Sequence, residues 1–262
     1  MLSPEPMTRY WCRGCLAHGA QLLLNEFDLD RGAVVLDVAT GPGTVARIAA
    51  QRVGPYGRVV AADISRPMLD VARSKPSPPG AAPISYIESP ATPLAVESAV
   101  FDVVACQQGL QFFPDRLAAL GEMRRALKPD GHLAAAVWCR IEDNAIYAAL
   151  HAALCDSVPS DLADRLLAPF SWSDPQVMKG TIDAAGFRES RVRKATLPLV
   201  FEGGVAQAVG VLSASPLAPA LAALPQTTRD ALNAAARARL APFLKEGMVR
   251  GELTSNIAVA HA

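Results

Sequence analysis

The feature that most constrains the fold is an apolar segment that runs into a glycine turn and then into a helix. Residues 34–44 form the expected strand and turn, with Gly41 and Gly43, and Val45 to Arg52 form the expected helix. Glycines let the backbone bend sharply and let a ligand approach where a Cβ would collide. Free N–H groups at the helix start favour a carboxylate or a phosphate. The sequence therefore predicts a site for a nucleotide-like cofactor.

Two cofactor classes use this arrangement. A second expected strand, Arg58 to Asp63, ends in a carboxylate, the residue type that holds ribose hydroxyls. Residues 41–46 fit the dinucleotide pattern G-x-G-x-x-G/A, and Asp63 lies 20 residues beyond Gly43. Asp37 would repel a pyrophosphate but suits an ammonium group. The pair of carboxylates favours a nucleoside that carries an amino acid.

Strands and helices alternate along the following sequence. Further strands are expected over Ile84 to Ile87, Phe101 to Cys106 and Leu133 to Trp138, and a helix runs from Pro114-Asp115 to Leu127. Such alternation predicts an α/β fold with a parallel sheet, helices on both faces, and ligands at the carboxyl ends of the strands. Residues 107–113, which follow the fourth strand, are therefore the expected place of the chemistry.

Four motifs in this order resemble the class I S-adenosylmethionine-dependent methyltransferases, in particular the small-molecule type that includes the ubiquinone and menaquinone biosynthesis enzymes. Besides the first turn, they are Asp63-Ile64-Ser65 with Met68-Leu69, Phe101-Asp102-Val103-Val104, and Leu127-Lys128-Pro129-Asp130-Gly131. The resemblance covers roughly residues 30–140. It implies a Rossmann-like, doubly wound, mostly parallel seven-stranded sheet with helices on both faces and a helical cover. The implied cofactor is S-adenosyl-L-methionine, with S-adenosyl-L-homocysteine as product.

The resemblance also implies a set of cofactor-binding residues and shows two departures. Ala39 stands where the family often has its first glycine, so we expect a negative φ there. Ser89-Pro90-Ala91 replaces the family's Gly-Asp-Ala, so adenine recognition would use backbone groups near Ala91, or Glu88. The predicted cofactor residues are Asp37, Ala39, Thr40, Gly41, Gly43, Asp63, Ile64, Met68, Pro90, Ala91 and Gln107.

The expected reaction is methyl transfer to an O, N or C atom of a small-molecule acceptor. Since the donor is already activated, the protein mainly has to align donor and acceptor and exclude water. A base is needed only for an acceptor that arrives protonated, and His18 and His151 are the candidates. Histidines such as these are more often solvated or satisfied than bases. The predicted substrate residues are Tyr10, Trp11, Gln108, Gln111, Phe112 and Trp138. Trp11 could instead belong to the core.

Several classes of partner are disfavoured. Lys and Arg balance Asp and Glu at 25 each, so no broad field attracts nucleic acid or an anionic membrane. The segment Gln107-Gln108-Gly109 lacks the Asn or Asp followed by prolines that nucleobase amine methyltransferases carry. Val205 to Leu224 is interrupted by serines and prolines, and Met1 to Tyr10 does not read as a signal peptide. We expect a cytoplasmic protein, with a homodimer as an open alternative.

The remaining sequence suggests additions to the core. The predicted segments are an N-terminal helical lid (1–30), the cofactor-binding core (31–140), a helical cover with late core elements (141–250) and a C-terminal strand (251–262). Within the last, Ile257 to Ala260 would be a short strand that closes the sheet. Cys12, Cys15 and His18 have metal-ligand spacing, but no second ligand pair follows, so no metal is predicted.

Three other functions stay open at this point. A nicotinamide-dependent oxidoreductase would share the first turn. An enzyme of the same fold could use the bound sulfonium for a pericyclic or decarboxylation step without methyl transfer. A binding scaffold would retain the ligand without turnover.

Overall fold

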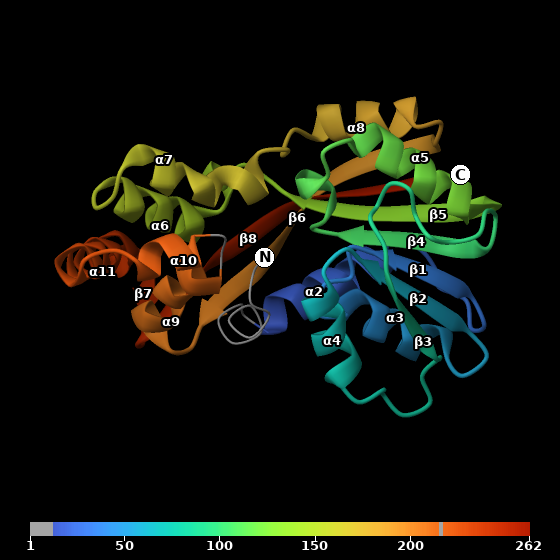
Figure 1. The fold of residues 1–262 in the computed structure, drawn as a ribbon, viewed down its shortest axis with the longest axis horizontal. Helices are drawn as coiled ribbons and strands as arrows, with labels where there is room; N and C mark the ends of the chain where they lie inside the picture. Colours follow the sequence, from blue (N-terminus) through green and yellow to red (C-terminus); the bar gives the residue numbers. More distant parts are fainter. Residues whose placement is uncertain (1–12, 215–216) are drawn as a thin grey trace. The chain divides into compact units, whose positions relative to one another are not determined.

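The computed structural model describes residues 13–214 and 217–262 (Figure 1). Its centre is a sheet in the order β3-β2-β1-β4-β5-β8-β6, with a short β7 paired to β8. The strands are β1 (Val34–Val38), β2 (Arg58–Asp63), β3 (Ile84–Glu88), β4 (Phe101–Gln107), β5 (Leu127–Trp138), β6 (Arg188–Phe201), β7 (Leu244–Lys245) and β8 (Met248–His261). The first five strands are parallel to one another, and β8 is antiparallel to β5. The predicted mostly parallel sheet is confirmed, and the two-residue β7 adds an eighth strand.

Helices connect and follow these strands. The α-helices are α2 (Arg13–Leu24), α3 (Thr44–Val53), α4 (Arg66–Ser74), α5 (Arg116–Ala126), α6 (Ala145–Cys155), α7 (Ser160–Ala163), α8 (Pro175–Ala184), α9 (Gly204–Gly210), α10 (Ala218–Ala222) and α11 (Gln226–Leu240). The 3-10 helices are η1 (Leu110–Phe112), η2 (Ile141–Asp143), η3 (Asp164–Phe170), η4 (Val211–Ala214) and η5 (Ala241–Phe243). Among the described residues, no helix has both the length and the apolar character needed to cross a membrane.

Apolar residues alternate between the two faces of the sheet, as the two-residue period of a strand requires. In β1, Leu36 and Val38 join a buried cluster that includes residues of α5 and α8. Val35, which precedes Leu36, joins a second cluster with residues of α2 and α3. The sheet is therefore covered by helices on both faces, as the alternation of strands and helices predicted.

The chain divides into two compact units that are discontinuous in sequence. One contains residues 17–138, 172–195 and 255–262, and the other is built mainly from residues 139–171 and 196–254. The 14-residue strands β6 and β8 each contribute to both units. In α2, Ala20, Leu23 and Leu24 are fully buried. The division into a lid, a core, a cover and a C-terminal strand remains a prediction.

Two strands are longer than expected. The predicted short strand over Ile257 to Ala260 is wrong in length, because β8 begins at Met248 and pairs with β7 before it reaches β5. Strand β5 begins at Leu127, which pairs with Phe101, and a shift in register precedes the pairing of His132 with Val103. Sheet pairing, which depends on distant residues, extends both strands through polar sequence.

Candidate active site

The parallel register brings the ends of four strands to one edge of the sheet. Val38 at the end of β1 pairs with Ala62, one residue before Asp63 at the end of β2. On its other side, Asp37 pairs with Ala105 of β4. Gln107, at the end of β4, pairs with Ala136 of β5. The two carboxylates and the glutamine segment therefore lie at the same edge, as the fold predicted.

The turn after β1 is built on left-handed backbone. Gly41 and Gly43 have φ of 53° and 78°, and Ala39 has φ of 56°. The expectation of a negative φ at Ala39 is therefore wrong: the turn keeps the glycine-like conformation although the residue carries a methyl group. A Cβ added to Gly41 would meet nothing within 4 Å, whereas one added to Gly43 would come within 3.0 Å of the Ala72 Cβ. Gly41 faces open space, and Gly43 permits close packing against α4.

Asp63 closes this turn from the second strand. Its Oδ2 accepts a hydrogen bond from the Gly41 N–H at 2.7 Å, and its Oδ1 accepts one from the Ser65 N–H at 2.8 Å. Ile64, the next residue, has 72% of its surface exposed, while Met68 of α4 is buried. The structure thus joins the glycine turn directly to the predicted ribose ligand and leaves one apolar side chain open beside it.

Asp37 lies beneath the turn and is only 1% exposed. Its Oδ2 accepts hydrogen bonds from Thr40 Oγ1 at 2.5 Å and from the Ala46 N–H at 2.9 Å. Burial raises the pKa of the Asp37 carboxyl to about 7, against the lowering effect of these two hydrogen bonds, and the nearby charge of Asp63 raises it further. Asp37 therefore organises the turn and the start of α3 from inside.

A chain of polar side chains follows the end of β4. Gln111 donates from Nε2 to Gln108 Oε1 at 3.2 Å, and Gln108 donates from Nε2 to Ser255 Oγ at 3.0 Å. Ser255 pairs with Trp138 in the sheet, so these predicted substrate residues lie in one neighbourhood. Gln111 is 3% exposed, and its Oε1 has no hydrogen-bond partner among the described residues. Phe112 is exposed on η1.

Packing joins the turn after β1 to the segment after β4. A Cβ added to Gly109 would lie 2.7 Å from the Ala39 Cβ and 2.9 Å from Cys106 Sγ, so only glycine fits at 109 without movement. Arg116 then fixes η1 by donating to the carbonyls of Leu110 at 3.1 Å and Gln111 at 2.9 Å. The predicted cofactor and substrate segments are therefore in contact.

The segment that departs from the family pattern has a structure of its own. Ser89 is buried, donates from Oγ to the Pro90 carbonyl at 2.9 Å, and accepts from the Ala95 N–H at 3.0 Å. Glu88 is exposed and pairs with Arg66 at 3.3 Å. Ala91 is partly buried. The serine stabilises the loop internally, and the adenine contacts of Pro90, Ala91 or Glu88 remain predictions.

Three contacting residues were missed at the level of sequence. Lys75 donates from Nζ to the Pro42 carbonyl at 2.6 Å and so braces the glycine turn. Arg116 holds η1, and Ser255 ends the glutamine chain. Each of these residues forms its hydrogen bond with a segment that is distant in sequence, or lies in a segment without a motif. No local sequence pattern therefore identifies them.

The two predicted base candidates lie in different compact units. His18 is exposed on α2. His151 of α6 lies with Nε2 3.1 Å from Asp164 Oδ1. Tyr10 and Trp11 fall outside the described residues, so their predicted substrate role remains a prediction.

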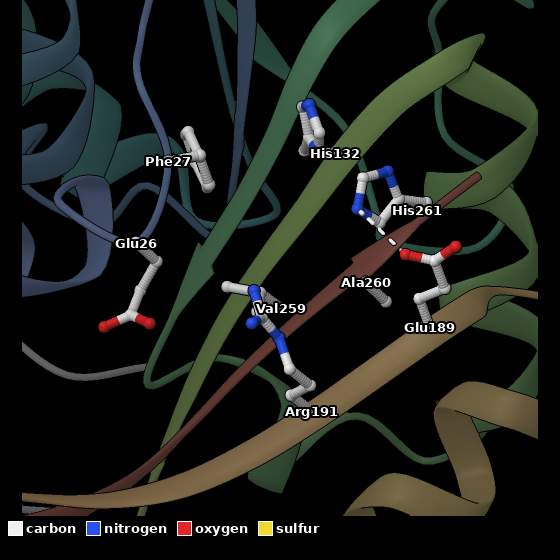
Figure 2. A pocket seen from close by; sticks show the side chains of 8 residues that line it. All are labelled: Glu26, Phe27, His132, Glu189, Arg191, Val259, Ala260 and His261. Atoms are coloured by element: carbon white, nitrogen blue, oxygen red, sulfur yellow. Dashed lines mark ion pairs between the residues drawn. The ribbon is translucent and has the colours of Figure 1, made fainter.

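A small cavity of about 80 Å³ lies beside His132, in the middle of β5 (Figure 2). His132 there stacks on Phe27 at 5.7 Å between ring centres and meets the edge of His261 at 4.5 Å. His261 Nε2 lies 3.9 Å from Glu189 Oε2. Trp138 lies six residues further along the same strand, and none of the residues that line this cavity is a predicted site residue.

Comparison with known proteins shows which family a part of this chain resembles. Residues 36–135 match the model of a methyltransferase domain. This matched segment, and not the whole chain, resembles a methyltransferase domain. All eleven predicted cofactor residues fall inside the matched segment, whereas His18, His151 and Trp138 fall outside it.

Two curated relatives and one solved structure extend the comparison. The ubiquinone/menaquinone biosynthesis C-methyltransferase of Hahella chejuensis is 36% identical over 124 residues, which cover 45% of this chain and 50% of the relative. The nocamycin O-methyltransferase of Saccharothrix syringae is 35% identical over 44% of this chain and 41% of the relative. The chain thus spans half or less of the length of these two relatives. The YcgJ protein of Bacillus subtilis shares the fold, with a TM-score of 0.61, 17% identity, and coverage of 93% and 97% of the two chains.

Proposed function

We propose that this protein transfers a methyl group from S-adenosyl-L-methionine to an O, N or C atom of a small-molecule acceptor. The observation that carries the proposal is the open space at Gly41. Its backbone N–H is held by Asp63, and a side chain at this position would extend into that space. A ligand with a ribose fits such a turn, because the backbone is bare on one side and a carboxylate lies on the other.

The residues around the turn fit the parts of this cofactor. Asp63 has lone pairs left on both oxygens after it accepts from Gly41 and Ser65, so it would hold the ribose hydroxyls. The exposed Ile64 would cover one face of the adenine. Because Asp37 is buried, we propose that it acts on the cofactor's ammonium through its charge beneath the turn. When bound, the cofactor supplies a methyl group already activated on a sulfonium.

The remaining predicted residues would hold the acceptor. Gln111 Oε1 is buried and lacks a donor within the described residues, so an acceptor hydroxyl or amine would satisfy it. Glutamines cannot take a proton at neutral pH, so they orient the acceptor and do not activate it. A phenol or an alcohol as acceptor would need a base. His18 and His151 are the candidates that the sequence predicts, and the choice between them remains a prediction.

The relatives support a small acceptor and leave its atom open. One is a C-methyltransferase of quinone biosynthesis and the other an O-methyltransferase. The balanced charge of the chain gives no support to a nucleic-acid partner. The cytoplasmic location and the homodimer remain predictions.

The rival nicotinamide hypothesis makes a different prediction for binding. A dinucleotide would place a pyrophosphate near the buried Asp37, which disfavours it electrostatically. Calorimetric titration with S-adenosylhomocysteine and, separately, with reduced nicotinamide dinucleotide distinguishes the two. We expect heat only with the first ligand. The reverse result would overturn the proposal.

Substitution of the predicted ribose ligand tests the same site. Asp63→Ala should weaken S-adenosylhomocysteine binding by about 1 to 3 kcal/mol, because charge-assisted hydrogen bonds to the hydroxyls are lost. Asp70→Ala is the matched control, since Asp70 is an exposed carboxylate on α4 that pairs with Arg66 and Arg73. Unchanged affinity in the Asp63 variant would remove this residue from the site. A panel of phenol, amine and enol acceptors, followed by mass spectrometry, then separates methyl transfer from scaffold or non-methylating chemistry.

A further inference from the structure

A second group of chemically active side chains lies outside the site described above. It consists of His151 and Cys155 on α6 and Asp164 at the start of η3, all in the unit built mainly from residues 139–171 and 196–254. Their ligating atoms all lie within 4.8 Å of one another. The His151 Nε2 is 3.1 Å from Asp164 Oδ1 and 3.7 Å from Cys155 Sγ. One nitrogen, one sulfur and one oxygen atom thus lie close together.

The fold holds these three side chains in place. His151 and Cys155 are four residues apart, so they share one face of α6. One turn earlier on the same helix, Tyr147 contacts the ring of Phe170 at the end of η3, with 5.5 Å between ring centres. Both aromatic rings are buried. The contact ties α6 to the element that carries Asp164.

Two of the three separations are close to those of a tetrahedral metal centre, and the third, between Cys155 Sγ and Asp164, is at most 4.8 Å. Zinc binds cysteine sulfur at about 2.3 Å and histidine nitrogen or carboxylate oxygen at about 2.0 to 2.2 Å, so neighbouring ligand atoms lie roughly 3.3 to 3.6 Å apart. The observed separations of 3.1 and 3.7 Å are close to these values. A mixed thiolate, imidazole and carboxylate set is characteristic of zinc and its neighbours in the first transition row.

The cluster is also accessible. Cys155 and Asp164 are exposed, and His151 is half-buried. Asp164 lines a cavity of about 430 Å³ together with Arg140, Glu142 and Phe170, so water or a small ligand can approach the carboxylate. A metal held by three protein ligands keeps a fourth position open.

We propose that His151, Cys155 and Asp164 bind a divalent ion of the zinc class, with a solvent molecule as the fourth ligand. Binding releases the Cys155 thiol proton to solvent and forms the bond from sulfur to metal. The metal occupies His151 Nε2, so this nitrogen is a ligand and not the base of the transfer reaction. The inference is independent of the proposed methyl transfer, because it concerns residues outside the segment that resembles a methyltransferase domain.

Cobalt(II) is the probe, since it substitutes for zinc and absorbs light. The protein to titrate carries Cys12→Ser and Cys15→Ser, which remove the other cysteines with metal-ligand spacing. We expect one equivalent of Co²⁺ to bind and to give a thiolate-to-cobalt charge-transfer band with the visible bands of tetrahedral cobalt. Zinc should displace it. Absence of stoichiometric binding would overturn the proposal.

Single substitutions then locate the ion. Cys155→Ser should abolish the charge-transfer band, and Asp164→Asn should weaken Co²⁺ binding by about tenfold or more. Asp161→Asn, an exposed carboxylate on α7, should leave both unchanged. A band that persists in the Cys155 variant would contradict the assignment. If the double serine background does not fold, the unsubstituted chain serves instead, and Cys155→Ser must lower its cobalt stoichiometry by one.

Discussion

Burial gives the carboxyl of Asp37 a pKa of about 7, close to physiological pH. Its ionised form carries the charge that suits an ammonium, and its protonated form does not. A cationic ligand group therefore binds better to the ionised form of Asp37. Its binding lowers the pKa of this carboxyl, which then releases its proton. At the residue scale, the predicted cofactor site is thus coupled to pH through one side chain.

The expected result is an affinity that rises with pH. As the pH rises toward 7, the dissociation constant of S-adenosylhomocysteine should fall by at most about tenfold for each pH unit. Above the pKa of Asp37 it should stay constant. Calorimetry between pH 5.5 and 8.5 measures this. Asp37→Asn should bind more weakly and show a flat profile over the same range. An equally steep profile in the variant would assign the effect to another group.

The backbone conformation of Ala39 could not be predicted from the sequence. The resemblance identified it as the substitute for a glycine, but its positive φ became visible only in the structure. A short alanine can adopt this conformation at a cost of about 1 to 2 kcal/mol, and the hydrogen bonds of the surrounding turn maintain it. Neighbouring Thr40 donates its N–H to the Ala62 carbonyl at 3.0 Å, which ties the turn to β2.

At the scale of elements, the contact between the two loops predicts an energetic coupling. Gly109 has φ of −104°, so alanine there is free of backbone strain and its cost is steric. Gly109→Ala should destabilise the protein by about 1 to 3 kcal/mol. In an Ala39→Gly background, Gly109→Ala should cost less stability, because the Ala39 Cβ is absent. The other close atom, Cys106 Sγ, is still present.

Urea unfolding of the two single variants and the double variant measures this coupling. Ala39→Gly alone should raise stability by up to about 1 kcal/mol, since relief of strain exceeds the entropy that glycine adds to the unfolded chain. Equal costs of Gly109→Ala in both backgrounds would show that the two loops do not contact through these atoms.

Sequence predicts those elements whose signals are local. Strand β2 matches its expected bounds, and Asp115 and Asp174 accept backbone N–H bonds at the starts of α5 and α8, as helix-starting aspartates do. The extent of β8 was missed because Arg250, Gly251 and Glu252 do not resemble a strand by themselves. Gln108 and Gln111 are predicted substrate residues from their position after β4, and this role stays a prediction. Their hydrogen-bonded chain was not predicted, because its end at Ser255 depends on a strand that arrives 147 residues later.

At the scale of the whole molecule, His132 predicts a loss of stability in acid. Burial, and secondarily the neighbouring His261, lowers the pKa of His132 below its ordinary value of 6.5. The unfolded chain therefore binds this proton more readily, so stability falls as the pH drops below about 6.5 and through the lowered value. One such proton limits the slope to about 1.4 kcal/mol per pH unit.

Thermal unfolding between pH 7.5 and 5 tests this expectation. His132→Asn should show a smaller fall in the melting temperature over this range than the unsubstituted chain. His261→Gln should lie between the two, because it removes the second cause of the shift and leaves burial. The same slope in all three proteins would place the acid sensitivity elsewhere.

The shared strands β6 and β8 have a consequence for protein engineering. Beyond residue 17, the chain passes between its compact units at residues 138–139, 171–172, 195–196 and 254–255, and the last two passages interrupt β6 and β8 in mid-strand. Neither unit can be excised as a contiguous fragment. A chimaera with a relative must preserve, at its junctions in β6 and β8, the alternation of side chains between the two faces of the sheet. An insertion or deletion of one residue would move every later side chain of the strand to the opposite face.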